Sequence, residues 1–70
     1  MLLADYEIVI AGEIDPACAV EFAPAEVTFS DGRTTVRAAA IDQAALHGII
    51  DRISSLGLTL VSVSSEARGS

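Results

Sequence analysis

Apolar residues recur at steps of three and four between residues 41 and 56, in the main periodic run of the chain. This spacing places them on one side of a helix. Asp42 precedes the run, and its carboxylate can accept a hydrogen bond from an amide of the first turn. Gly57 follows it, where glycine takes the left-handed conformation at least cost. The pattern predicts a helix whose apolar side packs on a sheet, with Ala45, Leu46, Ile49, Ile50, Ile53 and Leu56 on that side.

Four other segments have the pattern of β-strands. Three of them alternate between apolar and polar positions, which is the period of a strand with one buried face. The last is rich in leucine and β-branched residues. The predicted strands are residues 6–14, 25–30, 33–41 and 58–63.

Asp31-Gly32 lies between two of these strands and is a strong signal for a two-residue β-hairpin. A turn at this point fixes the register and places one valine pair on the buried face and one threonine pair on the other. The predicted pairs are Ser30 with Arg33, Phe29 with Thr34, Thr28 with Thr35, Val27 with Val36, and Glu26 with Arg37.

A short helix is predicted between the first two strands. Asp15-Pro16 is typical of a helix start and Pro24 ends the segment, so residues 17–22 form one to two turns. The order is then β-α-β-β-α-β. Right-handed crossovers make this a ferredoxin-like α+β sandwich, a four-stranded antiparallel sheet with a short first helix and a long second helix on one face. If residues 15–24 form a loop instead, the chain is a β-meander with one helix and a final strand.

The 70 residues allow one small domain, which we place at residues 6–63, with a leader at 1–5 and a disordered tail at 64–70. A core of this size barely offsets the roughly 100 kcal/mol that ordering such a chain costs. One cysteine excludes an intrachain disulfide, and a single cysteine and histidine argue against structural zinc. Oligomerisation is therefore the most available support.

The net charge is −6, with four arginines and no lysine. Nucleic acids and anionic membranes need a basic surface, so neither partner is expected. The first residues lack the positive start of a signal peptide, and no segment approaches the roughly 20 apolar residues of a membrane span. We expect a cytoplasmic protein, which fits a single unpaired cysteine.

Few residues suggest chemistry. His47 has only Asp51 one turn away as a partner, so we interpret it as a surface or boundary histidine. Cys18 has no basic residue near it in sequence, and we expect it to be a small buried hydrophobe rather than a nucleophile. No phosphate loop, catalytic triad or metal motif is present, so no catalytic, cofactor or metal-binding residue is predicted.

Gly48 is unusual because glycine inside a helix costs about 1 kcal/mol relative to alanine. With Ala44, Asp51 and Ser55 it forms a lane of small residues along the helix. Close packing against the first helix or the sheet is the preferred explanation. The alternative is a groove for a partner helix.

The segment Asp42 to Gly48, together with Leu56-Gly57-Leu58 and residues 60–63, resembles a group of small, mostly uncharacterised bacterial proteins. These proteins are ferredoxin-like in pattern and carry a first strand, an Asp-Pro and an Asp-Gly hairpin like those found here. The similarity spans about residues 6 to 63. It implies the fold and carries no assigned activity.

The sheet face turned away from the helices is the predicted interaction surface, because an apolar centre with a polar rim commonly marks an interface. Our first hypothesis is a non-enzymatic module that forms a homodimer or docks on a larger protein through this face. The candidates are Val9, Ala11, Thr28, Thr35, Arg37, Ala39, Val61 and Val63.

Two other functions remain open. A regulatory domain could bind a small molecule at a dimer interface, near residues 12–15 and the start of the main helix. A dimeric α+β barrel enzyme could act on an apolar substrate, with His47 or Tyr6 as the polar group in an enclosed pocket.

Overall fold

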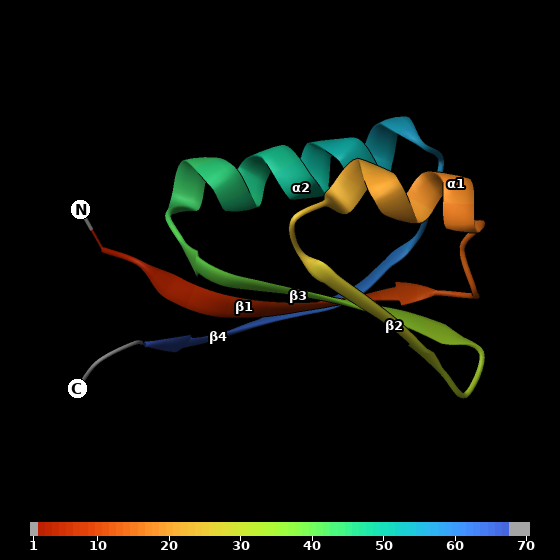
Figure 1. Cartoon of the computed structure of the whole chain (residues 1–70), viewed down its shortest axis with the longest axis horizontal. Helices are drawn as coiled ribbons and strands as arrows, with labels where there is room; N and C mark the ends of the chain where they lie inside the picture. The colour runs from red at the N-terminus through yellow and green to blue at the C-terminus, as the bar shows by residue number, and fades with distance from the viewer. Residues whose placement is uncertain (1, 68–70) are drawn as a thin grey trace.

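A computed structural model describes residues 2–67, and within them it shows one sheet with helices on one face (Figure 1). The strands lie in the order β2-β3-β1-β4, and each neighbouring pair is antiparallel. The elements are β1 (Ala4–Ala11), α1 (Pro16–Ala19), the 3-10 turn η1 (Val20–Phe22), β2 (Glu26–Ser30), β3 (Arg33–Ile41), α2 (Gln43–Ser55) and β4 (Leu60–Ala67).

The predicted α+β class and four-stranded antiparallel sheet are confirmed within residues 2–67. Residues 16–22 are helical, so the alternative with a loop at 15–24 is wrong. The α-helical part of this segment has four residues, which rise only about 6 Å along a helix axis. With so short a first helix the ferredoxin-like arrangement is not established, and the coarser class is what the structure shows.

The hairpin forms at Asp31-Gly32 as predicted. Both turn residues have positive φ, 54° at Asp31 and 72° at Gly32, as a two-residue turn between right-twisted strands requires. All five predicted pairs between β2 and β3 are present, from Glu26 with Arg37 to Ser30 with Arg33. This local register is therefore confirmed in full.

Both ends of α2 are capped as predicted. The Ala45 amide donates to Asp42 Oδ1 at 2.8 Å. At the other end, Gly57 has φ 74°, and the Leu58 amide donates to the Ile53 carbonyl at 3.0 Å, which satisfies a carbonyl that the helix leaves free. The apolar side is narrower than predicted: Leu46 and Ile53 are buried and Ile49 and Ile50 half-buried, but Ala45 and Leu56 are exposed.

The core lies between the helices and the two inner strands. Ile8 and Ile10 of β1, and Val36 and Thr34 of β3, are all 0% exposed. Their neighbours on the outer strands are more open. The two rows on the helix side, read across the sheet from β2 to β4, are Val27, Val36, Ile8 and Val63, and then Phe29, Thr34, Ile10 and Leu60.

Thr34 is the one buried polar residue among those described. Its hydroxyl donates to the Gly12 carbonyl at 2.8 Å and accepts from the Ile14 amide at 3.1 Å. These two bonds hold the segment that leaves β1 against β3. The φ of 80° at Gly12 ends β1 at Ala11, three residues before the predicted end.

The predicted limits of the domain are too narrow. β1 begins at Ala4 and β4 continues to Ala67, because main-chain pairing such as that of Tyr6 with Ser65 does not depend on apolar side chains. β4 starts at Leu60 rather than Leu58, since the Leu58 amide is used by the α2 cap. Parts of the expected leader and tail, residues 1 and 68–70, lie outside the described residues.

Candidate functional site

The face of the sheet turned away from the helices is largely polar. The middle row across the strands has hydroxyl groups on both sides of one apolar residue, and the next row is charged. These rows are Thr28, Thr35, Val9 and Ser62, and then Glu26, Arg37, Glu7 and Ser64. Val9 and Thr35 are half-buried, whereas Thr28 and Ser62 are exposed.

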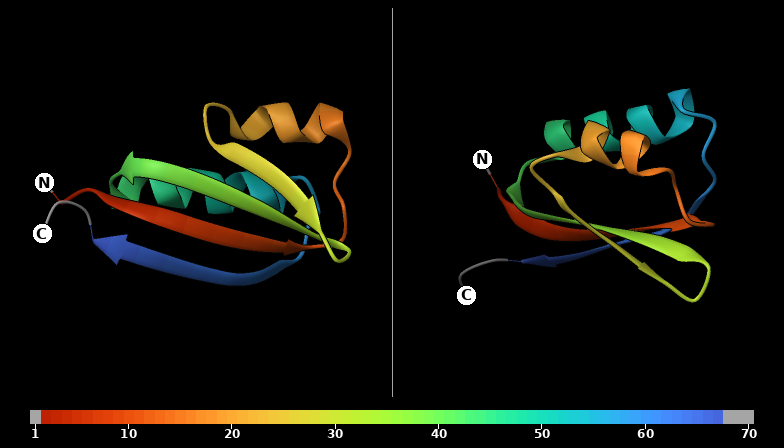
Figure 2. Two further views of the ribbon diagram at one scale, coloured as in Figure 1. Left: turned by 60° about the horizontal axis from the view of Figure 1, so that its bottom comes forward. Right: turned by 45° about the vertical axis from the view of Figure 1, so that its right-hand side comes forward.

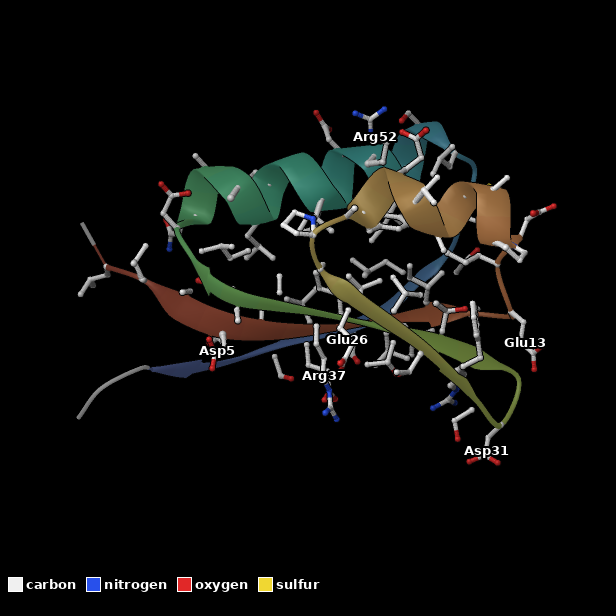
Figure 3. All side chains as sticks on the ribbon, viewed as in Figure 1. Asp5, Glu13, Glu26, Asp31, Arg37 and Arg52 are labelled. Atoms are coloured by element: carbon white, nitrogen blue, oxygen red, sulfur yellow. The ribbon has the colours of Figure 1, made fainter. Side chains whose placement is uncertain are left out.

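Arg37 projects from this face between two glutamates. Its Nη2 lies 3.0 Å from Glu7 Oε2 and its Nε donates to the same oxygen at 3.1 Å. Glu26 is its direct neighbour on β2, and Figure 3 shows both side chains on the face away from the helices. The side chains of Arg37 and Glu7 are 63% and 44% exposed, so solvent weakens this ion pair.

The structure separates the predicted interface residues into two groups. Val9, Thr28, Thr35 and Arg37 share the outer face by register, and Ala11 and Ala39 follow them by alternation. Val63 does not, because it pairs with the buried Ile8 on the helix side.

The reason is a bulge in β4. Val9 pairs with Ser62 and Ile10 with Leu60, so Val61 is an additional residue without a direct partner on β1. The bulge reverses the alternation that starts at Leu60, so the outer face receives Ser62 and Ser64, and Val63 lies on the helix side. The expected apolar centre is therefore reduced to Val9 and small alanines. That these residues form an interface stays a prediction.

Exposed apolar side chains gather instead on β4, in a group that we call the β4 margin: Leu60, Val61 and Val63. They are 40%, 45% and 37% exposed. Leu60 and Val63 lie on the helix side, yet their row neighbours Ile10 and Ile8 are fully buried. The helices thus cover β1 and leave β4 open, at the side of the sheet farthest from α1 (Figure 2).

An open hollow of about 560 Å³ continues this surface beside the other end of β4. Tyr6 and Ser65, which are paired across β1 and β4, both line it. Leu3 also lines it and is 46% exposed. The apolar surface beside β4 therefore extends toward the start of α2.

A second open groove, of about 550 Å³, lies between α2 and the segment that joins η1 to β2. Phe22 and Ile49 form part of its floor, and an ion pair of 3.1 Å between Arg52 Nη1 and Glu21 Oε1 closes one side. Gly48 lines it, and a Cβ there would meet nothing within 4 Å. The preferred explanation of Gly48 by close packing is therefore wrong, and the groove alternative stays open.

The residues with possible chemistry are not brought together. His47 is exposed, as predicted, and Tyr6 is half-buried beside β4. Cys18 is half-buried and packs against the core, in line with its expected role as a small hydrophobe. In residues 2–67 no group of three His, Cys, Asp or Glu side chains is placed to hold a metal ion.

The two parts of the predicted ligand site lie at opposite ends of the sheet. Gly12 follows the pair of Ala11 with Arg33, whereas Asp42 follows the pair of Ala4 with Ile41 (Figure 1). One copy of the chain does not assemble such a site. Among the described helices, none has the length and apolar character needed to cross a membrane.

The alternation of β4 could not have revealed the β4 margin, because Leu60 and Val63 are an odd number of positions apart. Only the bulge brings them to one face.

The chain belongs to the family described as "Domain of unknown function (DUF8691)", whose model matches residues 5–64. No curated protein and no solved structure matches the chain.

Proposed function

We propose that this chain is a small non-enzymatic protein-interaction module that binds its partner, a second copy or a larger protein, through the β4 margin. The observation that carries the proposal is the exposure of Leu60, Val61 and Val63 on a strand at the edge of the sheet. The ferredoxin-like assignment, the bacterial origin suggested by the resemblance and a cytoplasmic location are further parts of it.

The energetic argument has two parts. Fully burying a leucine or valine side chain contributes roughly 1.5–3 kcal/mol relative to leaving it exposed. The outer edge of a terminal strand also presents main-chain groups that another strand can pair with, and proteins usually protect such edges with charges, proline, short strands or bulges. β4 has eight residues, and Leu60 to Ser65 contains neither a charge nor a proline. The bulge at Val61 interrupts one end of this run, so the regular part of the edge begins at Ser62.

The outer sheet face is the second candidate surface. Its half-buried Val9 and Thr35 favour some contact there. Burying that face would also bury the row of Glu26, Arg37 and Glu7, and removing charges from water is costly unless each is paired. The β4 margin has no such cost, so we rank it first.

The two alternative functions gain no specific support. A metabolite sensor would need a second chain to bring residues 12–15 near the start of α2. For an enzyme acting through His47 or Tyr6, the hollow that Tyr6 lines is open to solvent rather than enclosed. The test of the proposal therefore concentrates on association.

The experiment compares the full chain with a Leu60→Ser/Val63→Ser variant and with Val20→Ser as the matched control. Val20 is 69% exposed on η1, away from β4. We expect the β4 variant to lose self-association in sedimentation equilibrium, or to lose a partner that the control retains in quantitative pull-downs. A chain that stays monomeric at high concentration and shows no difference between the two variants would refute the proposal.

A further inference from the structure

We infer that β4 pairs antiparallel with β4 of a second copy about a two-fold axis, so that the two sheets join edge to edge. This inference rests on the proposed function and names its partner. Leu60 and Val63 of the two copies then meet on the helix side of the joined sheet, and Ser62 and Ser64 meet on the outer side.

The backbone supplies the first argument. β4 is paired with β1 along its length, from Leu60 with Ile10 to Ala67 with Ala4, and it ends the sheet order. Its outer side therefore faces no further strand of the described chain. An extended strand is the occupant that such an edge accepts, because it supplies main-chain donors and acceptors in register.

Length and the distribution of charge favour β4 over the other edge. β2 has five residues, begins with Glu26 and is followed by Asp31 in the hairpin turn. Two copies with net charge −6 repel each other, and like charges directly opposite on paired strands are destabilising. β4 also carries one charge, Glu66, but this residue follows an uncharged run of six residues from Leu60 to Ser65, whereas the uncharged run of β2 has four, from Val27 to Ser30. The longer run lets two copies approach without that penalty.

Self-complementarity selects a second copy over an unrelated strand. In a two-fold contact each residue pair occurs twice, so the same surface must fit itself. β4 has apolar residues on the helix side and serines on the outer side, and an antiparallel copy presents the same two sides. The second copy also buries part of the Leu60 and Val63 side chains, which the helices of one chain leave exposed.

Cross-linking tests this geometry directly. Directly paired residues share a face of the sheet, so a two-fold axis at residue 62 pairs Ser62 with itself, one at 63 pairs Ser62 with Ser64, and one at 64 pairs Ser64 with itself. We would introduce Ser62→Cys and Ser64→Cys singly in a Cys18→Ser background. Each variant is oxidised alone, and the two are also oxidised as a mixture. Ser30→Cys, at an exposed position on β2, is the control for the other edge. A disulfide-linked dimer is expected from β4 and not from Ser30. Equal cross-linking at both edges, or none on β4, would overturn the inference.

Complementary charges provide the second test. Ser62 is exposed, so Ser62→Lys and Ser62→Glu should leave the fold intact, which circular dichroism would verify. We expect each variant alone to weaken dimerisation by about tenfold, and their mixture to restore it. Thr28→Lys, at an exposed position in the same row on β2, should leave the dimer unchanged.

The outcomes separate the two proposals. If Thr28→Lys dissociates the dimer and Ser62→Lys does not, the outer face is the interface and the β4 inference is wrong. If the chain is monomeric but Leu60→Ser/Val63→Ser loses a protein partner, the second copy is wrong while the interaction module stands. If neither association exists, both proposals fail.

Discussion

At one edge of the sheet Phe29 of β2 is 45% exposed, and at the other Leu60 of β4 is 40% exposed. The two strands nevertheless differ in how they are protected. β2 is short, tied to β3 by a tight hairpin, carries Glu26 and follows η1, whose Phe22 is only 3% exposed. β4 is longer and carries one charge, Glu66, which follows six uncharged residues from Leu60 to Ser65. The two edges thus have similarly exposed apolar side chains, and they differ in length, in the distribution of charge and in the cover of the neighbouring helical segment.

The largest expected effect concerns Phe22, the buried side chain of η1, the segment that precedes β2. Phe22→Ala removes a buried aromatic ring and should lower the free energy of unfolding by about 3–5 kcal/mol. In a domain of this size that loss leaves little folded protein. Denaturant unfolding of Phe22→Ala beside Val20→Ala, which should change stability by less than about 0.5 kcal/mol, measures it. Similar midpoints for the two variants would show that η1 does not protect the β2 side.

The next largest effect concerns Thr34, whose hydroxyl holds residues 12–14, the segment between β1 and α1, against β3. Thr34→Val keeps the shape but leaves the Gly12 carbonyl and the Ile14 amide without their partner. We expect a loss of about 1–3 kcal/mol in thermal or denaturant unfolding. Thr34→Ser is the control, since it keeps the hydroxyl and loses one methyl group. A larger loss for serine than for valine would contradict the role of these hydrogen bonds.

The two edges can be compared directly with matched substitutions. Leu60→Ser on β4 should weaken self-association by about tenfold, or about 1.4 kcal/mol, because an apolar contact is lost from the interface. Phe29→Ser on β2 removes a similarly exposed side chain and should leave association unchanged. Sedimentation equilibrium of both variants measures the dissociation constants. An equal effect at both edges would remove the distinction between them.

Beyond the fold class and the antiparallel sheet, the features that were predicted correctly to the residue are those with local causes. The hairpin register follows from Asp31-Gly32 and the alternation beside it, and the limits of α2 follow from Asp42 and Gly57. Each of these features is decided within a few residues. The sequence therefore contains enough information to place them.

The parts that were missed depend on contacts between distant segments. The bulge at Val61 arises where β4 is aligned on β1, and beyond it Val63 lies on the helix side while Ser62 and Ser64 lie on the outer side. The hydroxyl of Thr34 is buried only because residues 12–14 fold over β3. The alternation of residues along a single strand indicates neither the bulge nor the buried hydroxyl. For this reason the candidate surface moved from the outer face to the β4 margin.

The smallest effect concerns Gly48, in the groove on the β2 side of α2. A Cβ at this position meets no atom of the chain, and alanine favours a helix over glycine by about 1 kcal/mol. Gly48→Ala should therefore raise the unfolding midpoint slightly and leave dimerisation through β4 unchanged. Gly57→Ala is the contrasting control: with φ 74° its conformation disfavours a side chain, so it should lower stability. If Gly48→Ala weakens self-association while it stabilises the monomer, a second copy occupies this groove, and the interface lies on the β2 side rather than at β4.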